Sequence, residues 1–245
     1  MEKRLRLLLT NDDGIASHVI LPFVAQMRKR FEVVAIIPRQ DSSLTAHSVS
    51  LRPDRRLQLV DEDCYVLDGF PADCVALGLS APEFGLFGAV VAGVNHGLNV
   101  GFDVWYSGTV AAAREAALTG NRGIAISCAE FGRDTAGSAA ICAGLVEDIF
   151  ERGIAEKGAV TNINVPSLKA GGPKGLAVTR PAEHGTRSTF RLDKIHASEW
   201  RVGVALEESC GISCHRECEC QALRRGYASV AVAQRFQCAS AQERA

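Results

Sequence analysis

The chain has 245 residues, of which 47% are hydrophobic, and its 27 basic side chains nearly balance its 28 acidic ones. This length allows one large domain with a sizeable buried core. The balanced charge argues against a protein that binds a nucleic-acid duplex or an anionic membrane, because either partner would favour a basic excess.

The N-terminus combines basic residues with leucines, as a signal peptide does. Its apolar run is short, however, and acidic residues interrupt it at once. No apolar run of the chain is long enough to cross a bilayer. We therefore expect residues 4–10 to form a first buried strand and the protein to be cytoplasmic.

Short apolar runs alternate with helical patterns through the first two thirds of the chain. Strands are predicted at 4–10, 31–38, 87–95, 122–128 and 159–166, and helices at 18–30, 71–80, 109–120 and 135–153. Continuous apolar strands of this kind are buried on both faces. The alternation predicts an α/β fold with a mostly parallel sheet and helices on both of its faces.

The pattern changes after Pro166. Residues 181–215 are polar and lack long apolar runs, whereas residues 227–234 have the composition of a returning last strand. We place a boundary near residue 170 and expect an irregular appendage beyond it, with hairpins.

Polar segments follow three of the predicted strands. The acidic loop (residues 11–14) follows the first strand, the serine loop (residues 39–48) the second, and residues 95–109 the third. Ligands of open parallel sheets bind beyond the carboxyl ends of the strands. We therefore expect these three loops to converge at one edge of the sheet.

Asp12 and Asp13 place two carboxylates side by side at the end of an apolar strand. Neighbouring carboxylates repel each other unless a cation lies between them. The pair belongs either to a solvated turn, for which Asn, Asp and Gly are ordinary residues, or to a metal site. Carboxylate, hydroxyl and amide oxygens form the ligand set that Mg²⁺ and Mn²⁺ take.

The third loop ends in Tyr106-Ser107-Gly108-Thr109 and leads directly into a predicted helix. Hydroxyls and N–H groups at a helix N-terminus form an anion site, and a glycine lets a phosphate approach the backbone. Taken alone, Thr109 is more simply explained as a helix cap. Beside a metal site, a phosphate cradle indicates phosphoryl chemistry. The glycine spacing of residues 93–101 does not fit a dinucleotide fingerprint, so we discount a nicotinamide cofactor.

Five segments together resemble the SurE family, the survival-protein nucleotidases that remove phosphate from nucleoside monophosphates. They are LLLTNDDGI (7–15), DGFPADCVALGLS (68–80), VVAGVNHGLNVGFDVWYSGTVAAAREAAL (90–118), TNINVP (161–166) and GYASVAV (226–232). The resemblance implies one SurE-like domain over residues 1–245, with a Rossmann-like three-layer catalytic core at 1–170. It also implies one divalent cation per subunit, Mg²⁺ or Mn²⁺. Residues 171–245 would build a homodimer or homotetramer.

The resemblance also assigns roles to individual residues. The metal ligands correspond to Asp12, Asp13, Ser43 and Asn95, and the residues that hold the substrate phosphate correspond to Asn99, Ser107, Gly108 and Thr109. We expect a metal-dependent phosphatase that hydrolyses 5′- and also 3′-nucleotides, in which one of the two aspartates takes a proton from the attacking water. The alternative is a nucleotide-binding protein that kept the fold but lost turnover.

The serine loop departs from the family pattern. Leu44 replaces the glycine that follows the ligand serine, and Ser42 offers a second serine for the same role. Leucine resists backbone angles that glycine adopts, so we expect this loop to be set differently and Leu44→Gly to change kcat/KM or the substrate ranking. The family's His-Ala-Pro-Gly after the acidic loop is replaced by residues 16–19.

Six histidines and nine cysteines complete the candidates. We expect His18 to belong to the first helix. His47 and His96 lie in the active-site loops, where each is either without a catalytic role or, in the case of His96, positioned to orient a water. Buried free thiols are expected at Cys64, Cys74, Cys128, Cys142 and Cys238.

A cysteine cluster occupies residues 210–220. Cys214, His215, Cys218 and Cys220 have donor types that suit zinc, but their spacing matches no common zinc frame. Cysteines on one face of an exposed hairpin, or at an oligomer contact, are the alternatives. We predict no stoichiometric zinc there.

Overall fold

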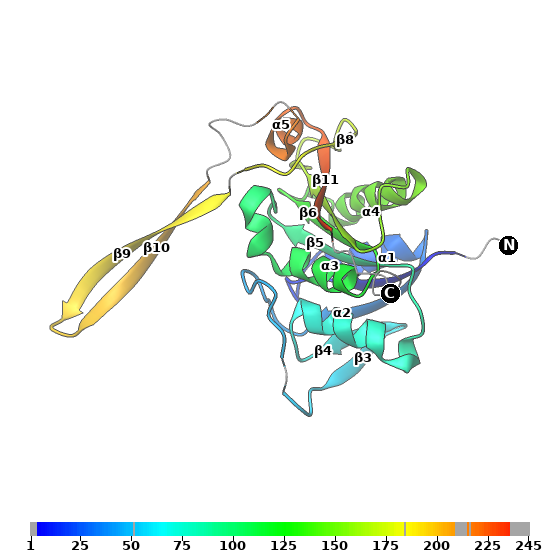
Figure 1. Cartoon of the computed structure of the whole chain (residues 1–245), viewed down its shortest axis with the longest axis horizontal. Helices are drawn as coiled ribbons and strands as arrows, with labels where there is room; N and C mark the ends of the chain where they lie inside the picture. The colour runs from blue at the N-terminus through cyan, green and yellow to red at the C-terminus, as the bar shows by residue number, and fades with distance from the viewer. Residues whose placement is uncertain (1–3, 51, 184, 209–214, 216, 236–245) are drawn as a thin grey trace, which may run out of the picture.

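A nine-stranded sheet runs through the centre of the molecule, in the order β3-β4-β2-β1-β5-β6-β7-β11-β8 (Figure 1). The structure is a computed structural model, and it describes residues 4–50, 52–183, 185–208, 215 and 217–235. The strands of the sheet are β1 (Arg6–Thr10), β2 (Glu32–Pro38), β3 (Leu57–Asp61), β4 (Cys64–Leu67), β5 (Ala89–His96), β6 (Gly123–Cys128), β7 (Ala159–Val165), β8 (Leu176–Val178) and β11 (Ala228–Arg235).

The order in which strands are added to the sheet reverses at β1. This strand pairs in parallel with β2 on one side and with β5 on the other. The chain first builds outward through β2 and β4, and then returns to start β5 on the opposite side of β1. The carboxyl ends of β1 and β5 therefore form a topological switch point, where open α/β sheets bind their ligands.

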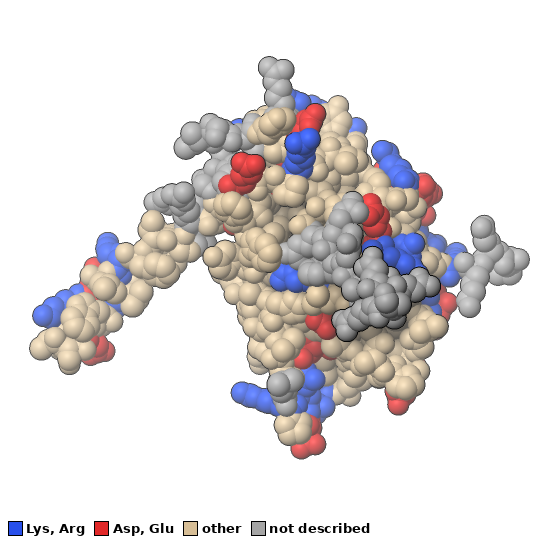
Figure 2. Space-filling model, in the orientation of Figure 1, with Lys and Arg blue, Asp and Glu red and all other residues tan. Residues whose placement is uncertain are grey.

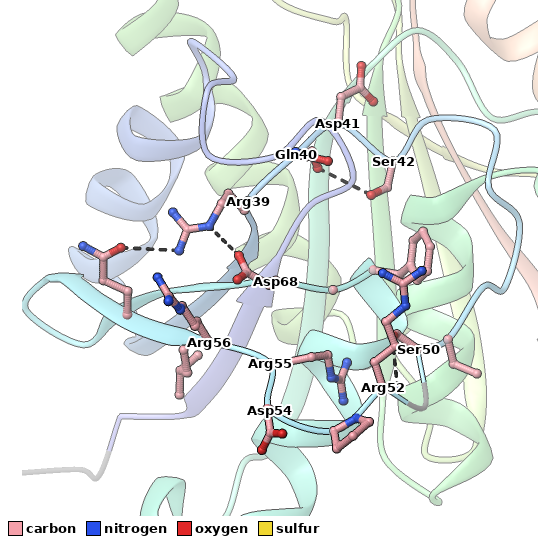
Figure 3. Close-up of a pocket in the computed structure, with 16 residues that line it drawn as sticks. Arg39, Gln40, Asp41, Ser42, Ser50, Arg52, Asp54, Arg55, Arg56 and Asp68 are labelled. Atoms are coloured by element: carbon pink, nitrogen blue, oxygen red, sulfur yellow. Dashed lines mark hydrogen bonds and ion pairs between the residues drawn. The ribbon is translucent and has the colours of Figure 1, made fainter.

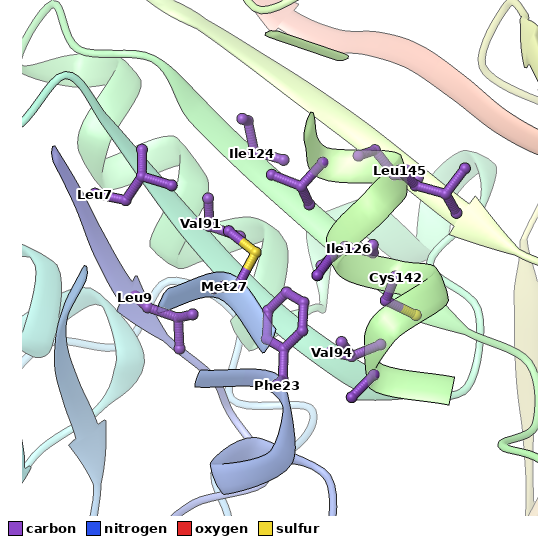
Figure 4. Close-up of a cluster of buried hydrophobic side chains, with 14 of the residues drawn as sticks. Leu7, Leu9, Phe23, Met27, Val91, Val94, Ile124, Ile126, Cys142 and Leu145 are labelled. Atoms are coloured by element: carbon purple, nitrogen blue, oxygen red, sulfur yellow. The ribbon is translucent and has the colours of Figure 1, made fainter. Parts of the chain in front are cut away.

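Helices cover both faces of the sheet. The helices are α1 (Ile20–Arg28), α2 (Pro71–Ser80), α3 (Gly108–Leu118), α4 (Thr135–Glu151) and α5 (Glu219–Arg224), with short 3₁₀ turns at Pro82–Phe84 and Gly101–Trp105. The largest core cluster joins α1 and α4 to one face through Phe23, Met27 and Cys142 (Figure 4). Alternate strand residues such as Leu8 and Val90 pack on the other face, which α2 and α3 cover.

The α/β fold is confirmed, and each predicted strand and helix of the first two thirds has a counterpart. Two local differences remain. His18 lies in a turn just before α1, because the helix begins only at Ile20. The antiparallel pair β3–β4 was not predicted, since every residue of β3 is exposed and its sequence shows no buried face.

The last third of the chain contributes both to the sheet and to a projecting arm. β11 pairs antiparallel with β7, as expected for the returning strand, and β8 pairs with β11. Between them, β9 (Thr186–His196) and β10 (Glu199–Glu208) form a long hairpin that extends away from the body (Figure 1).

Across the described residues, no helix has both the length and the apolar character needed to cross a membrane. On the face shown in Figure 2, both acidic and basic side chains are spread over the body. This distribution fits the near-neutral charge of the chain.

Candidate active site

The switch point carries the predicted cation ligands. Asp12 and Asp13 follow the end of β1, and Asn95 is the penultimate residue of β5. Because β1 and β5 are neighbours in parallel register, the chain places these side chains at the same edge of the sheet. The helix that begins at Gly108 starts at this edge as well.

Asp12 lies against the first turn of α3. Its side chain is 3% exposed; the Thr109 hydroxyl donates to Oδ1, and the Thr109 N–H donates to Oδ2 over 3.1 Å. A helix N-terminus favours a carboxylate because its free N–H groups carry partial positive charge. A Cβ at Gly108 would lie 2.9 Å from the Asp12 Cβ. Gly108 therefore admits Asp12, in addition to the phosphate role that we predicted for it.

Asp13 has an unpaired carboxylate oxygen. Its Oδ2 is buried and has no hydrogen-bond partner among the described residues. The pKa of Asp13 is raised to about 6, mainly by burial and secondly by the negative charge of Asp12. A hydrogen bond with the backbone of His96 opposes this and lowers the pKa. Burial likewise raises the pKa of Asp12. A divalent cation beside both carboxylates would offset this desolvation and repulsion.

Backbone hydrogen bonds join the acidic loop to the serine loop. The Ser42 N–H donates to the Asp12 carbonyl over 2.7 Å, and the Ile15 N–H donates to the Pro38 carbonyl over 3.0 Å. Gly14 has φ +75°, and a Cβ there would lie 2.7 Å from the Gln40 carbonyl carbon. Only glycine therefore fits the point where the two loops touch.

Asn95 is oriented by its own loop. Its Nδ2 donates to the Gly97 carbonyl over 2.8 Å. Because an amide group offers one acceptor oxygen and two donor hydrogens, this bond fixes the side chain with Oδ1 as its acceptor end. Asn95 can thus supply a neutral oxygen ligand beside the two carboxylates.

Asn99 belongs to a buried network of amides. Its Nδ2 donates to the Ser127 hydroxyl over 2.8 Å, which uses one of its two amide hydrogens. Its backbone N–H donates to Asn164 Oδ1, and its carbonyl accepts from the side chains of Asn162 and Asn164, all within 2.9 Å. The network fixes the loop between β5 and α3 onto β6 and β7.

Ser107 is the N-cap of α3. Its Oγ accepts from the Val110 N–H over 3.1 Å, which leaves the hydroxyl hydrogen to be donated elsewhere. The cap is therefore Ser107 and not Thr109, whose hydroxyl and N–H both contact Asp12. Thr109 therefore hydrogen-bonds the Asp12 carboxylate, in addition to any contact that it makes with phosphate.

The donor set fits a hard divalent cation. The described residues hold no group of three or more His, Cys, Asp or Glu side chains that could share an ion. A cation here would therefore rest on two carboxylates and on neutral oxygens, which is the kind of set that Mg²⁺ and Mn²⁺ accept. The unpaired Oδ2 of Asp13 is the observation that calls for a positive partner.

Comparison with known proteins assigns the chain to a family. Residues 7–188 match the family model described as Survival protein SurE. The chain is 34% identical over 180 residues to the 5′-nucleotidase SurE of Thermoanaerobacter sp. (strain X514), and the match covers 71% of each chain. The chain belongs to the SurE family.

Other SurE proteins support the same assignment. The 5′-nucleotidase SurE of Clostridium botulinum (strain Eklund 17B / Type B) is 34% identical over 203 residues, which covers 80% of this chain and 79% of the relative. The crystal structure of the SurE protein from Aquifex aeolicus superposes with a TM-score of 0.75 at 30% identity and covers 92% of both chains. The predicted family resemblance is confirmed.

Within this SurE chain, the two candidate serines differ in environment. Ser43 is exposed, and its hydroxyl and N–H both bond Asp41 Oδ1, over 2.6 and 2.7 Å. Ser42 is 6% exposed and lies directly against the acidic loop. These contacts favour Ser42 for the ligand role, which we had placed first on Ser43.

Leu44 adopts the backbone angle that glycine favours. Its φ is +59°, in the left-handed region, and its side chain is 75% exposed. Our reason for expecting a differently set loop was that leucine resists such angles. The structure instead shows the leucine in that strained region, so its replacement of the SurE glycine raises the energy of the loop without excluding this φ.

We now expect Leu44→Gly to stabilise the protein by about 1 kcal/mol, because a left-handed angle costs leucine about that much more than glycine. The substrate ranking should be preserved. Urea unfolding and kcat/KM for several nucleotides would measure both effects. Ala46 has φ +51°, so Ala46→Gly serves as a matched variant that should act in the same direction. A loss of stability in both variants would contradict the strain argument.

The three histidines near the loops have identifiable contacts. His96 stacks on Phe131 at 5.6 Å between ring centroids, and His18 meets the same ring edge-on at 5.5 Å. His47 Nε2 lies 2.8 Å from a Glu115 carboxylate oxygen. Phe131 was not predicted as part of this region, because it follows the fourth predicted strand and shows no local signal.

The cysteines divide into two groups. Cys64, Cys74, Cys128 and Cys142 are buried free thiols, as predicted, whereas Cys238 lies outside the described residues. In the 210–220 cluster, Cys210 and Cys214 also lie outside them. Cys218 and Cys220 are each 2% exposed and disulfide-bonded. A disulfide sulfur is not a thiolate ligand, which favours our prediction of no zinc. Because disulfides persist mainly in oxidising compartments, the cytoplasmic location stays a prediction.

Glu219 is a buried residue that the sequence did not indicate. It is 1% exposed, and its carboxylate accepts from the Gly101 N–H over 3.0 Å, the Ala182 N–H over 3.1 Å and Asn162 Nδ2 over 3.3 Å. Burial raises the pKa of Glu219, and these hydrogen bonds lower it. Through Gly101 and Asn162, the C-terminal segment supports the loop that contains Asn99.

Proposed function

We propose that this SurE chain is a metal-dependent 5′-nucleotidase that hydrolyses nucleoside 5′-monophosphates, and also 3′-monophosphates, to nucleoside and phosphate. Its relatives named 5′-nucleotidase SurE support this activity. The observation that carries the proposal is the buried, unpaired Oδ2 of Asp13 beside Asp12, at the switch point where α3 begins.

The cation, one Mg²⁺ or Mn²⁺ per subunit, would be held by Asp12, Asp13, Asn95 and Ser42 or Ser43. When bound, it supplies Lewis-acid activation of the phosphoryl group and of a water. Both oxygens of Asp12 are engaged by Thr109, so Asp13 is the aspartate of the pair available to accept the proton of the attacking water.

The start of α3 would bind the phosphate. The hydroxyl hydrogen of Ser107 is available to a phosphate oxygen, because its Oγ already accepts from Val110. The Gly108 N–H lies in the first turn and has no acceptor within the helix. Both donors are fixed before substrate arrives, and preorganised donors stabilise the charge that develops in the transition state. The second amide hydrogen of Asn99 completes the proposed cradle.

Phosphate release from a panel of nucleoside 5′- and 3′-monophosphates, with Mg²⁺, Mn²⁺ or a chelator, tests the proposal. We expect hydrolysis only with a divalent cation, loss of activity in chelator and recovery when the cation is restored. Hydrolysis that persists in excess chelator would contradict the mechanism. Nucleotide binding without any phosphate release would favour the non-catalytic alternative.

We infer that copies of the chain associate through the β9–β10 hairpin, as a homodimer or homotetramer. A two-stranded ribbon has little stability of its own in water. Its register places Phe190 opposite Val204 and Leu192 opposite Val202, so these side chains share one face. They are 58–68% exposed, which makes an apolar stripe. The arm that carries it projects from the body (Figure 1).

The double variant Leu192→Ser/Val202→Ser should lower the mass of the assembly in light scattering, because it removes the centre of the apolar stripe. Arg201→Ser changes the neighbouring position on the opposite face of β10 and should leave the mass unchanged. An unchanged mass in the double variant would show that the hairpin is not the contact between subunits.

A further inference from the structure

A large cavity opens beside the acidic loop, between the serine loop and residues 49–50 and 52–58 (Figure 3). Its volume is about 1250 Å³, which exceeds the roughly 300–1,000 Å³ of common small-molecule sites. Asp41 and Ser42 form part of its wall. The Ser42 N–H donates to the Asp12 carbonyl, so the cavity lies next to the acidic loop. A substrate bound at Asp12 would therefore lie beside the cavity.

Four arginines line the cavity. Arg39 and Arg56 lie on one side of the view in Figure 3, and Arg52 and Arg55 on the other. Arg39 is paired with Asp68, with 2.5 Å between Nε and Oδ1. Arg52 and Arg56 are exposed and have no ion pair with a carboxylate in the described part of the chain.

The wall of the cavity is built before any ligand binds. Asp73, which is 5% exposed, accepts from the Ser50 N–H over 3.0 Å and from the Phe70 N–H over 2.9 Å. It also pairs with Arg55 at 2.9 Å. A Cβ at Gly69 would lie 3.0 Å from this carboxylate, so the backbone passes it closely. One buried carboxylate therefore ties the segment at Ser50 to the start of α2.

Among the described residues, the ion pairs of the wall leave two of its four arginines without a carboxylate partner. Arg39 pairs with Asp68 and Arg55 with Asp73. Asp41 accepts two hydrogen bonds from Ser43. The guanidinium groups of the two arginines without carboxylate partners are thus available to an anion, and a guanidinium binds phosphate through two parallel N–H bonds.

We propose that this cavity binds a second phosphate group of the substrate, carried by the leaving nucleoside, through one of its two arginines without carboxylate partners, Arg52 or Arg56, which lie on opposite sides of the cavity (Figure 3). The inference rests on the proposed phosphatase function and specifies its substrate class: nucleoside bisphosphates are preferred over nucleoside monophosphates. One phosphate lies at the start of α3, and the leaving group extends past Ser42 into the cavity. A neutral leaving group leaves both guanidinium groups without a partner.

The test compares kcat/KM for adenosine 3′,5′-bisphosphate and for adenosine 5′-monophosphate, both with Mn²⁺. Charge-assisted hydrogen bonds to a phosphate lead us to expect a preference of about tenfold to hundredfold for the bisphosphate in the wild type. In Arg52→Gln/Arg56→Gln the ratio should fall toward one. Arg152→Gln is the matched control: this arginine, 54% exposed at the end of α4, pairs with Asp148 and lies outside the cavity.

The outcomes separate this proposal from the proposed function. Equal kcat/KM for the two nucleotides in the wild type, or a preference that survives in the double variant, overturns the phosphate site. If neither nucleotide is hydrolysed, equilibrium binding decides: tighter binding of the bisphosphate that is lost in the double variant sustains the site while the phosphatase function fails. Unfolding curves of the variants check that both arginine substitutions leave the fold intact.

Discussion

Asp12→Asn should abolish nearly all metal-dependent turnover. The substitution keeps the size of the side chain and an oxygen that can accept from Thr109, but it removes the charge that the cation requires. Because a bound metal contributes several kcal/mol of transition-state stabilisation, we expect kcat to fall by about 10³-fold or more. Calorimetric titration with Mn²⁺ and phosphate release measure the two effects.

The same variant should keep its fold. Burial raises the pKa of Asp12, so the ionised carboxylate is unfavourable in the metal-free protein, and the variant should melt at or above the wild type in chelator. Only the wild type should gain stability on adding Mn²⁺. Asp61→Asn, at a carboxylate of β3 that is 68% exposed, is the control. Full activity in Asp12→Asn would show that the acidic loop is a turn and not a metal site.

Thr109→Ala provides a graded comparison. If Thr109 contacted only phosphate, the variant would bind metal normally. Since its hydroxyl donates to Asp12, we expect the variant to lose metal affinity as well as kcat/KM, though less than Asp12→Asn does.

Glu219→Ala should cost both stability and activity. It removes the acceptor of two buried backbone donors, Gly101 N–H and Ala182 N–H, and each unpaired donor costs about 1–3 kcal/mol. We expect a loss of about 3 kcal/mol in urea unfolding. KM should rise because the loop that contains Asn99 loses its support.

Glu217→Ala is the matched control for this variant. Glu217 lies two residues away, its side chain is 67% exposed, and it reaches Arg180 at 3.8 Å. Glu219→Gln retains one acceptor oxygen and should give an intermediate loss. If Glu219→Ala unfolds at the wild-type urea concentration with an unchanged KM, the C-terminal segment does not support the loop.

The parts of the fold that the sequence predicted are those with local signals. Buried parallel strands are continuous apolar runs, and each helix of the core carries its own apolar pattern. The placement of Asp12, Asp13 and Asn95 at one edge of the sheet was predictable because the carboxyl ends of parallel strands share that edge. The resemblance to SurE proteins then added Ser43 and the phosphate loop.

The parts that were missed depend on contacts between distant segments. Thr109 and Asp12 are far apart in sequence, so only the fold could show that the hydroxyl reaches the carboxylate. Asp73 ties Ser50 to α2, and this contact shapes the arginine-lined cavity without any periodic pattern. Glu219 sits within a cysteine-rich segment whose composition pointed toward metal ligands instead.

The position of β11 in the sheet has a consequence for the timing of folding during synthesis. Among the described strands, β8 pairs only with β11, so the edge beyond β7 stays open until β11 has been made. Glu219 lies in the helix just before that strand. A ribosome-bound chain that already has Asp12 and Asn95 in place still lacks the support of the loop between them and α3. We expect such nascent chains to be inactive, so that folding order itself decides when the enzyme begins to work.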